Sequence, residues 1–210
     1  MNLQIALLHH PVTALGPGTR FGIWFQGCSI GCPGCMSRHT WDPSAGREIE
    51  VDEIVSRVAA CLPLDGVTIS GGEPFEQPQG LTELLEALHA LRAKRDAPFD
   101  LLCFSGLPWR RLQAEHGPVL RLLDAIVPEP YLSSVGRGAQ VAGSANQPLI
   151  TLSALGRRAH SEHPERVPLQ LIEDGERVAL IGTPFPGDLD LLQKRLADVG
   201  IELATTSWLA

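Results

Sequence analysis

The sequence predicts an α/β fold: an open partial barrel of parallel strands with helices outside and a small C-terminal ββα extension. Two observations support this class. Short apolar runs alternate with segments of helical periodicity over the first 153 of 210 residues, which is typical of parallel strands joined by right-handed crossovers. The composition then becomes polar and includes two prolines. We therefore predict a core domain of residues 1–153, a linker of residues 154–167 and an extension of residues 168–210.

The first half of the core contains the clearest elements. Residues 20–27 form an apolar strand after a glycine-proline turn. Apolar residues at helical spacing predict helices over residues 50–62 and 81–91, the second with a stripe of leucines. Residues 66–70 and 99–106 are apolar runs of strand length, so we expect both to be buried strands.

The later elements are shorter. A proline opens a predicted helix over residues 108–116, because proline fits the first turn of a helix. Residues 122–128 predict a short helix leading into a strand, and residues 148–153 a further strand. In the extension, two apolar runs surround Asp174-Gly175, which indicates a hairpin, and residues 187–200 predict a helix.

The charge balance and the N-terminus limit the class of protein. The chain has 17 basic and 24 acidic residues, a net charge of −7, which argues against a nucleic-acid binder. It has no run of 18 apolar residues, so we expect no membrane span. The N-terminus lacks a basic segment and a small-residue cleavage site, which predicts a cytoplasmic protein. Clustered cysteines in that reducing compartment bind metal more often than each other.

Three of the five cysteines form the motif C-x3-C-x2-C at Cys28, Cys32 and Cys35. An ordinary electron-transfer cluster or a closed zinc site uses four protein ligands. Three thiolates on a four-iron cubane would leave one iron open for an exogenous ligand and electron transfer. We expect Cys61 and Cys103 to be small buried hydrophobes.

Zinc is the alternative occupant of this motif. His39 stands four residues beyond Cys35, so three cysteines and one histidine could form a closed zinc site. Spacing alone leaves both possibilities open.

A glycine pair and a carboxylate follow the next predicted strand, at Gly71, Gly72 and Glu73. Because ligands of parallel α/β sheets bind at the carboxyl ends of the strands, this turn and the cysteine motif are expected at one edge. The glycines would let a ligand meet the backbone, and Glu73 would offer a carboxylate to a ligand ammonium. Taken alone, the tetrapeptide Gly-Gly-Glu-Pro (residues 71–74) is slightly more typical of a tight turn whose glutamate faces water.

Together these motifs resemble the radical S-adenosylmethionine (radical SAM) superfamily, and within it the activases of glycyl-radical enzymes, above all that of anaerobic ribonucleotide reductase. The Cys-Pro-Gly-Cys form, the Thr-Trp-Asp that follows and a late Gly-Ser-Ala-Asn-Gln narrow the resemblance to the activases. The matching segments are residues 16–20, 25–42, 68–74, 104–106 and 143–147.

The resemblance implies a mechanism and a set of cofactors. Cys28, Cys32 and Cys35 would hold a [4Fe–4S] cluster whose open iron binds the methionine part of SAM. The turn ending at Glu73 would bind the SAM amino group. Ser105 and Asn146 are further expected SAM contacts, although a strand cap and an ordinary turn residue would explain them equally well.

The implied reaction also requires partners. Reductive cleavage of SAM would give a 5′-deoxyadenosyl radical that abstracts a hydrogen atom from a glycyl-radical enzyme. A flavodoxin or ferredoxin would supply the electron. The alternatives are a radical SAM enzyme that modifies a peptide or small molecule, and a non-catalytic zinc-binding interaction module.

The sequence departs from the activases at several positions. Met36 and Leu107 stand where activases usually have aromatic residues, and residues 127–130 read Val-Pro-Glu-Pro where activases read Val-Asp-Gly. Ala142 replaces an arginine. His160 and His163 lie in a polar segment with prolines, so we expect both to be solvated rather than metal ligands.

Overall fold

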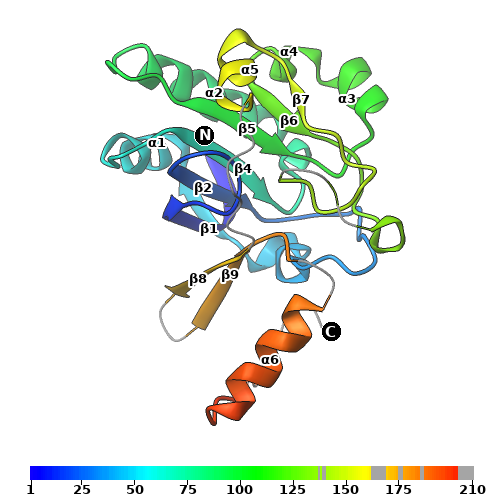
Figure 1. Ribbon diagram of the computed structural model, residues 1–210. Coiled ribbons are helices and arrows are strands. Elements are labelled where there is room, and N and C mark those ends of the chain that lie inside the picture. Colours follow the sequence, from blue (N-terminus) through cyan, green and yellow to red (C-terminus); the bar gives the residue numbers. More distant parts are fainter. Residues whose placement is uncertain (137, 139–140, 162–168, 175–176, 185–186, 203–210) are drawn as a thin grey trace.

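The computed structural model describes residues 1–136, 138, 141–161, 169–174, 177–184 and 187–202. His163 and the last eight residues therefore lie outside the described part. Within it, seven strands form one sheet in the order β3-β1-β2-β4-β5-β6-β7 (Figure 1). The bounds are β1 Asn2–Val12, β2 Arg20–Phe25, β3 Arg47–Glu50, β4 Gly66–Gly71, β5 Asp100–Phe104, β6 Ala125–Val127 and β7 Ile150–Thr151.

The centre of this sheet is parallel. Strands β2, β4, β5 and β6 run in one direction, while β1, β3 and β7 are antiparallel to their neighbours. The predicted α/β class is confirmed. The sheet is open, with β3 and β7 at its edges in the described residues, and the predicted barrel character is not confirmed.

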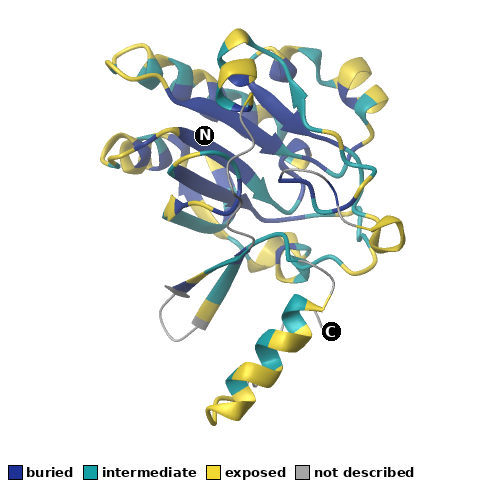
Figure 2. Cartoon of the chain, viewed as in Figure 1, coloured by how far each residue is buried: buried dark blue, intermediate teal, exposed yellow. Residues whose placement is uncertain are grey.

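Helices α1 to α4 bury one face of the sheet. Leu81, Leu84, Leu85 and Leu88 of α2 are fully buried, which confirms the leucine stripe predicted from the sequence. They pack in one apolar core with residues of α1 and of strands β1, β2, β4 and β5 (Figure 2). The helix bounds are α1 Val51–Ala59, α2 Pro78–Arg92, α3 Trp109–Glu115, α4 Gly117–Leu120, α5 Ala154–Ala159 and α6 Asp188–Asp198. No helix among the described residues is long and apolar enough to cross a membrane.

The C-terminal hairpin covers part of a second apolar cluster. Strands β8 (Leu169–Asp174) and β9 (Arg177–Gly182) pair antiparallel and precede α6, which is the predicted ββα order. Ile172 and Ile181 are buried against Trp24 of β2. The side chain of Gln170 adds two hydrogen bonds to the backbone at the end of β1, one from Thr13 N and one to Pro11 O. Helix α6 extends away from the sheet and has no buried residue (Figures 1 and 2).

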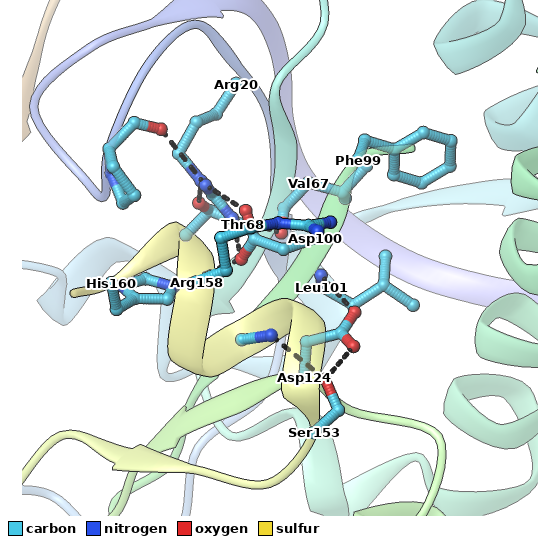
Figure 3. A network of polar contacts seen from close by, with 12 residues as sticks. Arg20, Val67, Thr68, Phe99, Asp100, Leu101, Asp124, Ser153, Arg158 and His160 are labelled. Atoms are coloured by element: carbon cyan, nitrogen blue, oxygen red, sulfur yellow. Dashed lines mark hydrogen bonds and ion pairs between the residues drawn. The ribbon is translucent and has the colours of Figure 1, made fainter. Parts of the chain in front are cut away.

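A buried ion pair lies where the parallel strands begin, at the edge opposite the cysteine motif. Arg20 and Asp100, the first residues of β2 and β5, form two hydrogen bonds of 2.7 and 2.9 Å (Figure 3). The remaining Arg20 donors bind Thr68 Oγ1 and the carbonyls of Pro17 and Val67, so all five N–H groups are paired. Arg20 belongs to one of the segments that resemble the activases, and its place in the fold is structural.

The predicted linker begins with helix α5, and the prediction for His160 was wrong. His160 is 8% exposed, and its Nε2 lies 3.1 Å from Asp100 Oδ2 (Figure 3). It therefore closes the Arg20–Asp100 network instead of facing solvent. The polarity of the segment misled the prediction, because the partner of His160 is 60 residues away in the chain.

Candidate functional site

The cysteine motif occupies a loop at the carboxyl end of β2. Phe25, the last residue of β2, is paired with Gly71 of the parallel strand β4, so the loop and the glycine turn leave the sheet side by side. Cys28, Cys32 and Cys35 are each partly buried, and none forms a disulfide. The predicted meeting of the two motifs at one edge of the sheet is confirmed.

The two ends of this loop are tied together by backbone hydrogen bonds. Gly27 N donates to Thr40 O over 2.7 Å, and Cys28 N donates to Trp41 O over 3.1 Å. The buried amide of Gln26 donates to the carbonyls of His39 and Asp42. Gln26 thus closes the loop, a role that sequence reasoning missed because its partners are 13 and 16 residues away.

Glu76 fixes the first turn of the loop. Its Oε1 accepts hydrogen bonds from the backbone N–H and the hydroxyl of Ser29, at 2.9 and 2.6 Å. Ser29 directly follows Cys28, so this carboxylate holds the chain next to the first cysteine. The sequence contains Glu76 three residues after Glu73, but nothing in that spacing indicates Ser29 as a partner.

Backbone packing accounts for the glycine pair. A Cβ on Gly72 would lie 2.1 Å from Gly27 O, and one on Gly71 would lie 2.4 Å from the backbone of Phe25. Gly72 N and Glu73 N also donate to the carbonyls of Phe25 and Gly27. These glycines therefore let the turn after β4 pack directly against the base of the cysteine loop.

Glu73 is fully buried between two strand ends. Its Oε1 accepts hydrogen bonds from Ser105 Oγ and Phe75 N, and its Oε2 accepts one from Gly106 N over 2.7 Å. Burial raises the pKa of Glu73 to about 7, although these three hydrogen bonds act to lower it. The structure thus brings together Glu73 and Ser105, two of the predicted site residues. The contacts of Glu73 connect the turn after β4 to the end of β5.

Asn146 lies on a different loop. Its Nδ2 donates to Pro130 O over 2.8 Å, while its Oδ1 is buried and has no hydrogen-bond partner among the described residues. A buried acceptor without a partner is unfavourable unless a ligand or water supplies a donor. A bound ligand with a hydrogen-bond donor would therefore satisfy the Oδ1 of Asn146. The predicted contacts of SAM with Glu73, Ser105 and Asn146 remain predictions.

Residues 14–150 match the family model described as "4Fe-4S single cluster domain". The chain belongs to this 4Fe-4S single cluster domain family. The matched residues contain all three cysteines of the loop, the glycine turn and Asn146. The C-terminal hairpin and α6 lie outside the match.

Named relatives agree with this family. The anaerobic ribonucleoside-triphosphate reductase-activating protein of Escherichia coli (strain K12) is 27% identical over 145 residues, covering 66% of this chain and 93% of the relative. That of Vibrio cholerae is 28% identical over 146 residues, covering 66% and 92%. The pyruvate formate-lyase-activating enzyme of Clostridium pasteurianum is 36% identical over 76 residues, covering 34% and 32%. These relatives confirm the resemblance to the radical SAM activases, which are enzymes with a [4Fe–4S] cluster and SAM as cofactors.

The cysteine loop fits the cluster of this 4Fe-4S family. Ser37 N donates to Cys35 Sγ over 3.4 Å, and the backbone N–H groups of Ile30 and Gly31 at Cys28 and of Tyr131 at Cys32 act to lower the pKa of those thiols. Such hydrogen bonds stabilise thiolates and tune cluster potentials. Burial raises the pKa of Cys28 and Cys32, so iron must compete with protons there.

The zinc alternative has less support from this geometry. No three His, Cys, Asp or Glu side chains among the described residues converge as a single metal ion would require. The thiolates of a cubane bind different iron atoms, so they do not need to converge on one point.

The two remaining cysteines lie outside the loop. Cys103 is fully buried and Cys61 partly buried, and Cys61 Sγ faces Arg57 O.

Proposed function

We propose that the protein cleaves SAM reductively and uses the resulting 5′-deoxyadenosyl radical to form a glycyl radical on a partner enzyme, with anaerobic ribonucleotide reductase as the first candidate. One observation carries the proposal. Three partly buried cysteines with N–H partners lie on one loop at the carboxyl ends of parallel strands, directly against the turn that contains Glu73. The loop contains no fourth cysteine.

The residues of the chain have distinct roles in this proposal. Cys28, Cys32 and Cys35 would bind three irons of the cluster, which supplies the electron for SAM cleavage when it is bound. The turn at Gly72 and Glu73 would orient the amino group of SAM beside the loop. The unpartnered Oδ1 of Asn146 would accept a hydrogen bond from the same ligand.

The family relationship suggests the partners. The relatives named above are, by name, activating proteins of anaerobic ribonucleoside-triphosphate reductase and of pyruvate formate-lyase. We infer that this protein acts on a glycyl-radical enzyme in the cytoplasm and receives its electron from a flavodoxin or ferredoxin. The net charge of −7 does not favour nucleic acid as a partner.

Two experiments test the proposal in sequence. The protein is reconstituted anaerobically with iron and sulfide and incubated with SAM and a strong reductant, and 5′-deoxyadenosine is quantified. It is then mixed with anaerobic ribonucleotide reductase, and a stable protein radical is sought by electron paramagnetic resonance. Cleavage of SAM in the first experiment and a glycyl radical on the reductase in the second support the proposed activase function.

The other outcomes distinguish the alternatives. If SAM is cleaved and a peptide or small molecule is turned over, but no radical forms on any glycyl-radical enzyme, the protein catalyses a different radical SAM reaction. A colourless protein with one tightly bound zinc would refute both enzymatic functions.

A further inference from the structure

The segment after β6 contacts the cysteine loop through Tyr131, the only tyrosine of the chain. A Cβ at Gly34 would lie 3.6 Å from Cε1 of the tyrosine ring, and a Cβ at Gly143 would lie 3.2 Å from Cδ2. The ring therefore lies between the cysteine loop and the loop of residues 143–147. The backbone N–H of Tyr131 also faces the Cys32 thiol and acts to lower its pKa.

Side chains of the second loop hold this segment in place. Gln147 Nε2 donates to Glu129 O and Asn146 Nδ2 donates to Pro130 O, both over 2.8 Å. On the other side of the tyrosine, Leu132 N donates to Ser144 Oγ over 3.1 Å. Three hydrogen bonds, at residues 129, 130 and 132, thus fix the backbone immediately before and after Tyr131.

The turn that leads to Tyr131 adopts an unfavourable backbone conformation. Glu129 has a φ of 83°, the one positive φ of a non-glycine residue among the described residues. Such a conformation persists only where the surroundings hold it. Here Glu129 N donates to Leu107 O, and Glu129 Oε1 accepts from Trp109 N at the start of α3. The backbone and the side chain of Glu129 are therefore both fixed by the segment after β5, in the orientation that directs Tyr131 toward the cysteine loop.

We propose that Tyr131 is a positioning residue of the cluster site, held by Gln147 and Ser144 so that its amide binds the Cys32 sulfur and its ring supports the turn at Gly34. This inference rests on the proposed role of Cys32 as a cluster ligand. An N–H donor withdraws electron density from a ligating sulfur and thereby raises the reduction potential of a cluster. The ring limits the opening of the turn between the second and third cysteines.

The test uses the reconstituted full chain without SAM. Three variants separate the contributions. Gln147→Leu removes the hydrogen bond to Glu129 O together with the three that Gln147 Oε1 accepts from Gly143 and Ser144. Tyr131→Ala removes the ring and keeps the amide, and Tyr131→Phe is the matched control. The readouts are the cluster reduction potential and the rate of iron loss to a chelator. Denaturant unfolding of each apo variant checks its fold.

We expect Gln147→Leu to lower the reduction potential and to accelerate iron loss by about tenfold, as for other residues that orient metal ligands. Tyr131→Ala should accelerate iron loss with little change in potential, and Tyr131→Phe should behave as the wild type. Wild-type potential and iron loss in Gln147→Leu would overturn the proposal. If Gln147→Leu does not fold, Ser144→Ala is measured instead. It removes the hydrogen bond from Leu132 N and the one to Gln147 Oε1 but keeps the bond from Gln147 Nε2 to Glu129 O, and a wild-type potential and rate of iron loss in this variant would likewise overturn the proposal.

The test of Tyr131 is independent of the test of the proposed function. A wild-type protein that holds its cluster but fails to cleave SAM refutes the function and leaves the positioning role intact. Altered potentials in the variants with normal SAM cleavage by the wild type support both.

Discussion

Glu73 and Ser105 are joined by a hydrogen bond of 2.9 Å between a fully buried carboxylate and a buried hydroxyl. Glu73 follows β4 and Ser105 follows β5, so the bond connects two strand ends beside the cysteine loop. The residue predicted to bind the SAM ammonium therefore also fixes the shape of the site. Its replacement is expected to affect both folding and ligand binding.

Glu73→Gln tests these two roles together. The partners of both carboxylate oxygens are donors, so an amide N–H₂ must face one of them without forming a hydrogen bond. We expect a loss of about 1–3 kcal/mol in the free energy of unfolding of the apo protein at pH 8, above the Glu73 pKa of about 7. SAM binding to the holoprotein should weaken by about 1.5–3 kcal/mol.

Denaturant unfolding and SAM titration measure the two effects of this substitution. Glu86→Gln, an exposed position on α2, is the control and should change neither. Unchanged SAM affinity in Glu73→Gln would show that Glu73 has a structural role and does not bind SAM.

Gly72→Ala should disturb the base of the cysteine loop. Its Cβ would lie 2.1 Å from Gly27 O, a backbone atom that cannot move without shifting Cys28. We expect a destabilisation of about 1–3 kcal/mol, as for overpacking, with reduced iron incorporation on reconstitution. Gly117→Ala is the matched control, because its Cβ would meet no atom closer than 3.8 Å. Equal iron content in both variants would contradict the packing argument.

The three cysteines of the loop should respond differently from the other two. Replacing Cys28, Cys32 or Cys35 by alanine should abolish SAM cleavage and the absorption of the reconstituted cluster. Cys61→Ser should retain both, because Cys61 lies beside Arg57, away from the loop. Ultraviolet–visible spectra and 5′-deoxyadenosine formation measure these outcomes. Loss of the cluster in Cys61→Ser would show that the ligand set is wrong.

The Arg20–Asp100 pair predicts a specific dependence of stability on pH. Burial alone would raise the pKa of Asp100, but the Arg20 charge and the hydrogen bonds from His160 and Arg20 bring it down to about 2. Because the folded-state pKa lies below the ordinary value of 3.8, this stabilisation is present above pH 3.8 and is lost as pH falls toward 2. The shift corresponds to about 2 kcal/mol.

Asp100→Asn should remove that part of the acid destabilisation. Denaturant unfolding of both proteins between pH 5 and pH 2, about the range of carboxylate titration, compares the slopes. The variant should be less stable than the wild type at pH 5, and the difference should shrink as pH falls. A constant difference across this range would show that Asp100 does not titrate as stated.

Ile181→Ala tests whether the C-terminal hairpin is part of the folded core. Ile181 is 2% exposed and packs in the cluster of Trp24, so its truncation should cost about 2–5 kcal/mol in the free energy of unfolding. Leu171 on the paired strand is 57% exposed, and Leu171→Ala should change stability by less than about 0.5 kcal/mol. Equal, small effects would show that the hairpin contributes little to the core.

Some departures from the activases acquire a physical meaning in the structure. Glu129 occupies a turn with positive φ, at a place where activases have the sequence Val-Asp-Gly. Glycine adopts this conformation without steric strain, whereas Glu129 depends on its contacts with Leu107, Trp109 and Gln147. Sequence comparison alone identifies the replacement of glycine by Glu129, but it does not show the contacts that hold Glu129 in this conformation.

The sequence by itself determined the α/β class, most of the helices and strands, and the cysteine motif with its glycine turn. These features depend on periodicity and spacing within short segments, and adjacent parallel strands necessarily end at one edge of the sheet. The tertiary structure alone decided that Glu73 binds Ser105, that Tyr131 reaches Cys32 and that His160 is buried on Asp100. Each of these pairs joins residues at least 32 positions apart, so only the packing of separate strand ends and loops could bring them together.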